Sequence, residues 1–234
     1  MIPLHDDAPT RHPPLVTVAL IALCTVIFLW QTLGDRVHQE SIVYALGVIP
    51  SVLTGNASLD PRLVWVPSYA TIFTSMFLHG GWLHLAGNML YLWIFGNNVE
   101  ESMGHGRFVV FYLLCGVAAV LAQTLPHPES DLPMIGASGA ISGVLGAYLL
   151  LLPRARVLVL IPLGFFFYTV RLPAAIVLVL WFVLQLVSSL LAAPGEGGVA
   201  FGAHIGGFVA GMALIGVFKR PGVRLRNPVS GVDL

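Results

Sequence analysis

Charge is the property that this sequence lacks most clearly. Only 9% of its 234 residues are Asp, Glu, Lys or Arg, whereas 57% are apolar. About a quarter of the residues in soluble domains are charged, so the composition excludes an ordinary water-soluble domain. The formal net charge is zero, which gives no basis for expecting a nucleic-acid or strongly acidic partner. The composition predicts a polytopic membrane protein, with the lipid bilayer as its surroundings.

Cysteine is almost as scarce as charge. The chain has two, Cys24 and Cys115, and each lies inside an apolar run. Two isolated thiols in such runs argue against a disulfide framework and against a cysteine-based metal knuckle. We expect both to pack as small buried hydrophobic residues.

Long uncharged runs are what the sequence has instead. The run from Leu15 to Leu33 covers roughly 28 Å as a helix, enough to cross the hydrocarbon core. A small-residue cleavage signature does not follow it, so we interpret it as a retained span and not a signal peptide. We predict an all-α fold with tails at 1–14 and 219–234 and one membrane domain at 15–218. Its six predicted spans are 15–33, 81–97, 107–125, 138–152, 172–193 and 199–218.

Two intervening segments are not counted as spans. Residues 98–106 are polar, and we expect a short turn there between the second and third spans. Residues 157–170 are apolar but short, are interrupted by Pro162 and Gly164, and have arginines at both ends. The sequence leaves open whether 157–170 forms a surface hairpin or a half-inserted helix.

Basic residues indicate the orientation. Six spans put both termini on one side, and Lys and Arg accumulate on the cytoplasmic side of short loops. With a cytoplasmic amino terminus, only Arg36 and Arg62 lie outside, and the other nine lie inside: Arg11, Arg107, Arg154, Arg156, Arg171, Lys219, Arg220, Arg224 and Arg226. A seventh span would turn Arg171 and the carboxy-terminal cluster outward. We therefore expect six spans and cytoplasmic termini, in a bacterial plasma membrane because no transit peptide is evident.

Polar residues inside predicted spans are costly and point to function. Ser138 begins the fourth span, His84 and Asn88 share one helix face in the second, and His204 lies in the sixth. Counted from the outer end at about 1.5 Å per residue, Asn88 lies roughly 10 Å deep and His204 roughly 8 Å deep. The fourth span is short, so its start at Ser138 should be sunk by roughly 9 Å. All four residues are thus predicted to lie in one layer.

Small residues allow these spans to approach closely. The fourth span carries Gly139, Gly143 and Ala147, and the sixth carries Gly202, Gly206 and Ala210 beside Ala203, Gly207 and Gly211. Such faces let helix backbones pack closely in lipid. Close packing would bring Ser138 within about 2.6–3.2 Å of His204, the reach that a serine nucleophile and its base require.

The start of a helix also suits an anionic intermediate. The first backbone N–H groups have no intrahelical acceptor and carry the positive end of the helix dipole. Asn88 and His84 would add two donors, and Gly136 and Gly139 suit a tight entry turn with backbone close to a substrate.

These residues resemble the rhomboid family of intramembrane serine proteases, and the resemblance covers all six spans. The family's G-x-S-G motif is Gly136-Ala-Ser-Gly139, its Ala-His motif is Ala203-His204 followed by Gly207, and its H-x-x-x-N motif is His84 to Asn88. His79 matches an upstream histidine of many members. The resemblance implies Ser138 as nucleophile, His204 as base, and His84, Asn88 and the Ser138 N–H as oxyanion donors. Family members use a Ser-His dyad without an acidic third member.

Two positions depart from the family pattern. The Trp-Arg pair that many members carry in the first loop is absent, and the region reads Trp65-Val-Pro-Ser-Tyr69. Ser142 stands where an aromatic residue often stacks on the catalytic histidine. The resemblance therefore does not indicate what positions His204.

We predict an intramembrane endopeptidase that cleaves transmembrane segments of other membrane proteins near the outer face. It would need no metal and no cofactor. The substrate and the oligomeric state are left open. One alternative is a catalytically inactive rhomboid-like binding or chaperone protein, and a second is a transporter, for which inverted repeats would be expected but are not evident. A three-histidine metal site of His79, His84 and His204 lacks the H-E-x-x-H pattern or a carboxylate ligand and leaves Ser138 unexplained.

Overall fold

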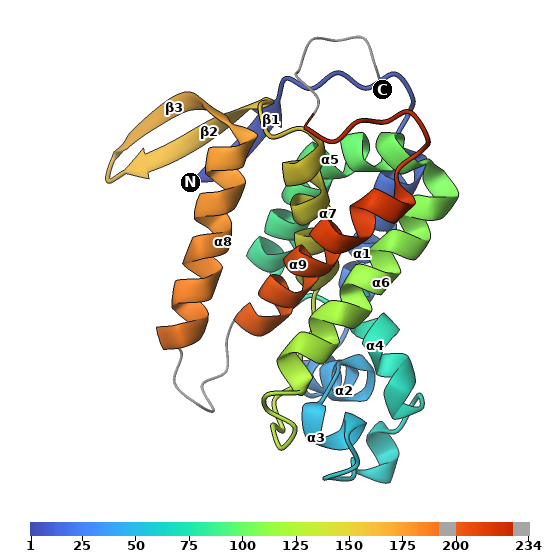
Figure 1. The fold of residues 1–234 in the computed structure, drawn as a ribbon. Helices are drawn as coiled ribbons and strands as arrows, with labels where there is room; N and C mark the ends of the chain where they lie inside the picture. Colours follow the sequence, from blue (N-terminus) through green and yellow to red (C-terminus); the bar gives the residue numbers. More distant parts are fainter. Residues whose placement is uncertain (192–199, 227–234) are drawn as a thin grey trace.

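The computed structural model describes residues 1–191 and 200–226 as a helical bundle with a small sheet at one end (Figure 1). The predicted helical fold is confirmed, and the sheet is its one addition. The helices are α1 (Leu15–Gln31), α2 (Arg36–Leu46), α3 (Pro50–Leu53), α4 (Thr71–Thr74), α5 (Trp82–Met103), α6 (His105–Thr124), α7 (Ser138–Leu151), α8 (Ala174–Leu191) and α9 (Phe201–Phe218). Short 3-10 helices cover Pro61–Leu63, Ser68–Ala70 and Ser75–Phe77.

Six of these helices occupy the six stretches predicted as spans. Within the described ranges, α6, α8 and α9 are long and apolar enough to cross a membrane, and α1 and α7 are apolar but shorter. The count of six spans therefore stays a prediction. The end of the 172–193 stretch, the start of the 199–218 stretch and the last residues of the 219–234 tail lie outside the described residues.

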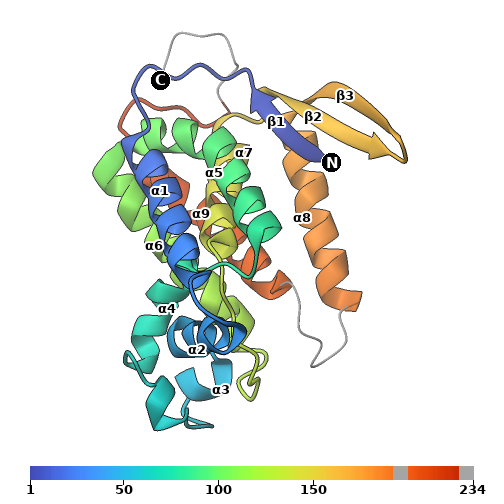
Figure 2. The same ribbon diagram turned by 180° about the vertical axis from the view of Figure 1, so that it is seen from behind.

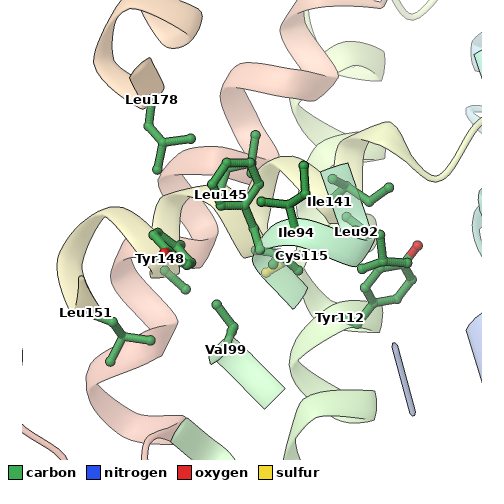
Figure 3. Packing of buried hydrophobic residues seen from close by; sticks show 14 of the residues in the cluster. Leu92, Ile94, Val99, Tyr112, Cys115, Ile141, Leu145, Tyr148, Leu151 and Leu178 are labelled. Carbon is green, nitrogen blue, oxygen red and sulfur yellow. The ribbon is translucent and has the colours of Figure 1, made fainter. Parts of the chain in front are cut away.

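Helix α7 lies at the centre of the bundle, and every residue from Gly139 to Tyr148 is buried. Figure 3 shows side chains of α5, α6, α7 and α8 gathered in one apolar core. Cys24 and Cys115 are buried free thiols, as expected. Helices α2, α3 and α4 lie together at the end of the bundle opposite the sheet (Figure 2).

The polar segment 98–106 is not the turn that its composition predicts. Helix α5 continues to Met103, and only Gly104, with φ +84°, separates it from α6. The polar side chains serve a neighbouring helix: Glu100 accepts hydrogen bonds from the backbone N–H groups of Val16 and Thr17 at 2.9 and 2.8 Å. Those N–H groups open α1, whose Pro14 cap gives them no side-chain partner. Glu100 thus caps α1, whereas Glu101 accepts from the backbone N–H of Arg11, before that helix begins.

Residues 157–170 form a surface hairpin and not a half-inserted helix. The segment forms an antiparallel hairpin of β2 (Arg156–Leu163) and β3 (Phe166–Pro173), and β1 (Ile2–Asp6) pairs with the other edge of β2. Part of the predicted amino-terminal tail is therefore an ordered strand. The Tyr148 hydroxyl of α7 donates to the Asp6 carboxylate, which ties this strand to the bundle.

Helices α7 and α9 are packed backbone to backbone. A Cβ placed on Gly207 would lie 1.9 Å from the carbonyl oxygen of Gly139, and one on Gly211 would lie 1.9 Å from that of Gly143. On another side of α9, a Cβ on Gly206 would lie 2.2 Å from the Cβ of Ala122 in α6. The small-residue faces that the sequence showed are thus used on two sides of α9.

Gly211→Ala should therefore destabilise the protein strongly. Its methyl group would collide with backbone, which cannot rotate away, and overpacking costs about 1–3 kcal/mol or more. The matched control is Gly216→Ala on the same helix, because no described atom lies within 4 Å of a Cβ there. Melting curves in detergent should show a lower Tm for Gly211→Ala and an unchanged Tm for Gly216→Ala. Equal Tm values would contradict this packing.

Asp6 should make stability depend on pH. Burial raises the pKa of the Asp6 carboxyl to about 6, against the lowering effects of the Tyr148 hydrogen bond and of His5. Between about pH 4 and 6 the folded chain then binds the proton more often than the unfolded chain, so this group's contribution falls as pH rises. Between these pH values the folding free energy loses at most about 3 kcal/mol from this group.

Asp6→Asn should remove this loss while keeping an oxygen that accepts from Tyr148. We expect the Tm of the variant to exceed that of the wild type by an amount that grows from pH 4 to pH 7. A difference that does not change with pH would show that Asp6 does not titrate in this range.

Candidate active site

The start of α7 forms one wall of a cavity of about 780 Å³. Helix α5 contributes His84 and Asn88 to its lining, α7 contributes Ser138, and α9 contributes His204. The loop before α7 also lines it, so the cavity lies toward the end of the bundle that carries α2, α3 and α4. Four residues that the sequence placed in one layer therefore line one cavity.

Ser138 and His204 are in direct contact. The Ser138 Oγ lies 2.8 Å from His204 Nε2, within normal hydrogen-bond distance. The close approach of Gly207 to the Gly139 carbonyl lies one residue from Ser138 and three from His204, so the α7–α9 packing sets this distance. His204 is 9% exposed, and Ser138 is half-buried at the cavity wall.

His84 has a defined tautomer. The backbone N–H of Gly80 donates to His84 Nδ1 at 3.2 Å, so in the neutral ring the proton is on Nε2. That nitrogen faces the turn before Ser138: a Cβ on Gly136 would lie 2.8 Å from it. Gly136 also has φ +126°, a conformation that side chains disfavour. Glycine at 136 leaves room for an N–H donor beside Ser138.

Asn88 supplies a free donor. Its amide nitrogen is buried and has no hydrogen-bond partner among the described residues, although the residue lines the cavity. An unpaired buried amide is costly, and such groups call for an explanation. A substrate oxygen in the cavity would satisfy it.

The remaining predicted residues are structural neighbours. His79 is 1% exposed and lies edge to face with His84, with ring centroids 5.2 Å apart, but it does not line the cavity. Gly139 packs against α6, where a Cβ would lie 2.6 Å from that of Ala119, and Gly207 packs against Gly139.

The three histidines do not form a metal centre. Both ring nitrogens of His204 are in hydrogen bonds, to Ser138 and to Gln185. Within residues 1–191 and 200–226, no three His, Cys, Asp or Glu side chains are grouped to hold an ion.

Sequence reasoning missed Gln185 and Trp181, both on α8. Gln185 Oε1 lies 2.7 Å from His204 Nδ1, and the Trp181 ring lies 5.8 Å from the His204 ring between centroids. The hydroxyl of Ser142, the residue at the usual aromatic position, donates instead to the Ser138 carbonyl at 2.6 Å. A lone glutamine in an apolar span was the available signal, because such a residue is costly unless it has a partner.

Comparison with known proteins agrees with the resemblance seen in the motifs. Residues 67–221 match the family model described as Rhomboid domain. RHOMBOID-like protein 5 of Arabidopsis thaliana is 32% identical over 188 residues, which are 80% of this chain and 56% of that protein. Rhomboid protease GluP of Bacillus subtilis (strain 168) is 35% identical over 137 residues, 58% of this chain and 24% of that protein.

The mitochondrial Rhomboid protein 1 of Saccharomyces cerevisiae is 31% identical over 141 residues, 54% of this chain and 41% of that protein. The chain thus spans less than two thirds of the length of these relatives. The family model, however, covers more than half of the chain, and it includes the cavity residues of α5, α7 and α9. The chain belongs to the rhomboid family.

Proposed function

We propose that this chain is an intramembrane serine endopeptidase that cleaves transmembrane segments of other membrane proteins near the outer membrane face. The observation that carries the proposal is the 2.8 Å contact between Ser138 Oγ and His204 Nε2 at the wall of a cavity. Family membership supports it at the level of protease, because relatives from Bacillus subtilis bear the names Rhomboid protease GluP and Putative rhomboid protease YdcA.

The chemistry follows from the contact. Ser138 Oγ attacks the scissile carbonyl carbon while its proton passes to His204 Nε2. The tetrahedral intermediate collapses, the C–N bond breaks, and His204 gives the proton to the leaving amine. A water molecule, deprotonated by His204, then hydrolyses the acyl-serine and restores the Ser138 hydroxyl.

Three donors would stabilise the oxyanion. The Ser138 N–H opens α7 and has no intrahelical acceptor. The Nε2–H of His84 faces the Gly136 turn, and the Asn88 amide has no other partner among the described side chains. Donors held in place before the reaction lower the barrier most, because they need no reorganisation.

The proposed membrane orientation puts the sheet end inside the cell. Figure 1 shows β1, the hairpin and the end of α9 at the same end of the bundle. The segments at that end contain most of the basic residues, as the cytoplasmic side should. The cavity then opens toward the outside, which would let water enter. The relatives include a protein of Bacillus subtilis and proteins named as mitochondrial and chloroplastic. Family membership alone does not identify the membrane, and we propose the bacterial plasma membrane.

A substrate helix would have to unwind at the site. Helical backbone carbonyls are already paired, so the scissile one must leave its intrahelical bond before Ser138 can attack. Small or helix-breaking residues near the outer end of a transmembrane segment should therefore mark substrates.

Cleavage of a fluorescent transmembrane substrate in liposomes tests the proposal. Ser138→Ala and His204→Ala should reduce cleavage to background, and Asn88→Ala should lower turnover by about 10²–10³. Ser41→Ala is the serine control, because the Ser41 hydroxyl only bonds to the Val37 carbonyl of α2. Cleavage that survives both dyad substitutions would refute the mechanism. A wild type that binds such substrates without cleaving any would favour the inactive binding protein.

A further inference from the structure

The contact between Gln185 and His204 crosses from α8 to α9. Gln185 Oε1 lies 2.7 Å from His204 Nδ1. An amide oxygen can only accept, so the contact requires the proton on Nδ1. The lone pair is then on Nε2, the atom that lies 2.8 Å from Ser138 Oγ. This is the tautomer in which His204 can take the serine proton.

The surroundings of Gln185 give it no other evident purpose. From Ala174 to Val187 it is the single strongly polar side chain of α8, in a stretch whose apolar residues are largely exposed. Trp181 lies one turn earlier on the same face and covers the His204 ring. Ser142 does not contact the His204 ring as an aromatic residue at its position would, because its hydroxyl donates to the Ser138 carbonyl. Gln185 and Trp181 contact His204 instead.

We propose that Gln185 is a positioning residue that fixes the orientation and tautomer of His204, with Trp181 packed on the ring. The proposal rests on the proposed function. A neutral acceptor does this without placing a carboxylate in the membrane-spanning part of α8, where an unpaired charge would be costly.

A consequence is that the dyad depends on the packing of α8. The buried residues described for α8 are Ala174, Val177 and Leu178, all near the sheet end. Gln185 lies two turns further on, after Trp181 and Phe182, which are partly buried against the core and contact Phe208 of α9.

Two substitutions at Gln185 separate positioning from simple packing. Gln185→Leu keeps the approximate volume but removes the acceptor, and kcat should fall about tenfold to a hundredfold with KM unchanged. Gln185→Glu keeps the acceptor and should recover much of the kcat. Leu186→Ala, at an exposed neighbour on α8, should leave both kcat and KM unchanged. Equal kcat for Gln185→Leu and wild type, or loss of kcat together with a large fall in Tm, would overturn the proposal.

A spectroscopic measurement keeps this test independent of cleavage. The ¹⁵N shifts of His204 should show Nδ1 protonated and Nε2 unprotonated in the wild type, and a mixture of tautomers in Gln185→Leu. If Ser138→Ala were fully active, the proposed function would fail while these shifts still reported the contact. A wild-type His204 protonated on Nε2 would overturn the positioning role itself.

A separate observation concerns the tip of the β2–β3 hairpin. Gly164, with φ +62°, helps to close a two-residue turn between the paired residues Leu163 and Phe166. The side chains around it are apolar and strongly exposed: Leu163 58%, Phe165 99%, Phe166 69%, Phe167 68% and Tyr168 57%. Strongly exposed apolar side chains gathered at one tip in this way mark an interaction surface.

The position of the hairpin indicates which surface it meets. Figures 1 and 2 both show the hairpin projecting sideways from the bundle near the first turn of α8. Its tip bends toward the side on which α8 lies. Helix α8 follows β3 directly and also carries exposed apolar residues, among them Ile176, Val179 and Leu180. The arginines Arg154, Arg156 and Arg171 are exposed near the root of the hairpin and not at its tip. This polarity matches lipid phosphates at the root and acyl chains near the tip.

Backbone hydrogen bonding limits the depth. In the described part of the chain β1 pairs with β2 only from Val157 to Leu160, and no strand pairs with the outer edge of β3. An open strand edge does not occur in the hydrocarbon core, because its N–H and C=O groups need water or headgroups. We infer that the hairpin tip lies in the headgroup layer of the inner leaflet, with its aromatic side chains reaching the first part of the acyl chains.

A fluorescent label at the tip tests this placement. Phe165→Cys, labelled with an environment-sensitive maleimide and placed in liposomes, should be quenched by nitroxides attached near the lipid headgroup and weakly by nitroxides deep in the chain. The native Cys24 and Cys115 are buried and should not react. Arg224→Cys, an exposed position after α9 at the same end, is the control and should respond to aqueous iodide instead.

Three results would overturn the inference. The tip label could respond to iodide as strongly as the control, it could be quenched best by the deep nitroxides, or its shielding could rise with the ratio of protein to lipid. The last result would show that a second copy of the chain covers the tip.

Discussion

The backbone contact between α7 and α9 is the constraint on which the rest of the structure depends. Carbonyl groups of α7 occupy the space that side chains at Gly207 and Gly211 would need, so the two helix axes can approach very closely. Only small residues permit such an approach in lipid, where helices associate by packing and not by the hydrophobic effect. A serine on one helix and a histidine on the other thereby come within hydrogen-bond distance.

The two partners of this contact are held very differently. Ser138 opens a helix that is surrounded by protein on all sides, so its position is fixed by the core. His204 lies between that helix and α8, whose outer face is exposed apolar surface. The polar network around Glu100 and the Asp6 contact hold the sheet end, far along the bundle from the cavity. These hydrogen bonds thus lie at one end of the bundle, and the cavity lies toward the other.

The sequence predicted the helical fold, the rhomboid resemblance and the meeting of Ser138 with His204, because helical rise converts sequence position into depth. It failed where partners lie on other elements. Polar residues 98–106 suggested a turn, but all of them except Gly104 are helical, and Glu100 caps α1. Residues 157–170 were ambiguous because a short apolar run does not distinguish strand from helix. Gln185 could not be assigned to His204 without knowing how α8 is rotated. The sequence showed that Ser142 replaces the usual aromatic residue. It did not show that Gln185 and Trp181 of α8 contact His204 in its place.

The most direct test of the central claim is the site at which a fluorophosphonate reacts. Such reagents label a serine only where a base activates it and donors stabilise the phosphoryl oxygen. Peptide mass spectrometry of the labelled wild-type protein should place the adduct on Ser138, and the His204→Ala protein should remain unlabelled under the same conditions. An adduct on another serine, or equal labelling without His204, would contradict the account.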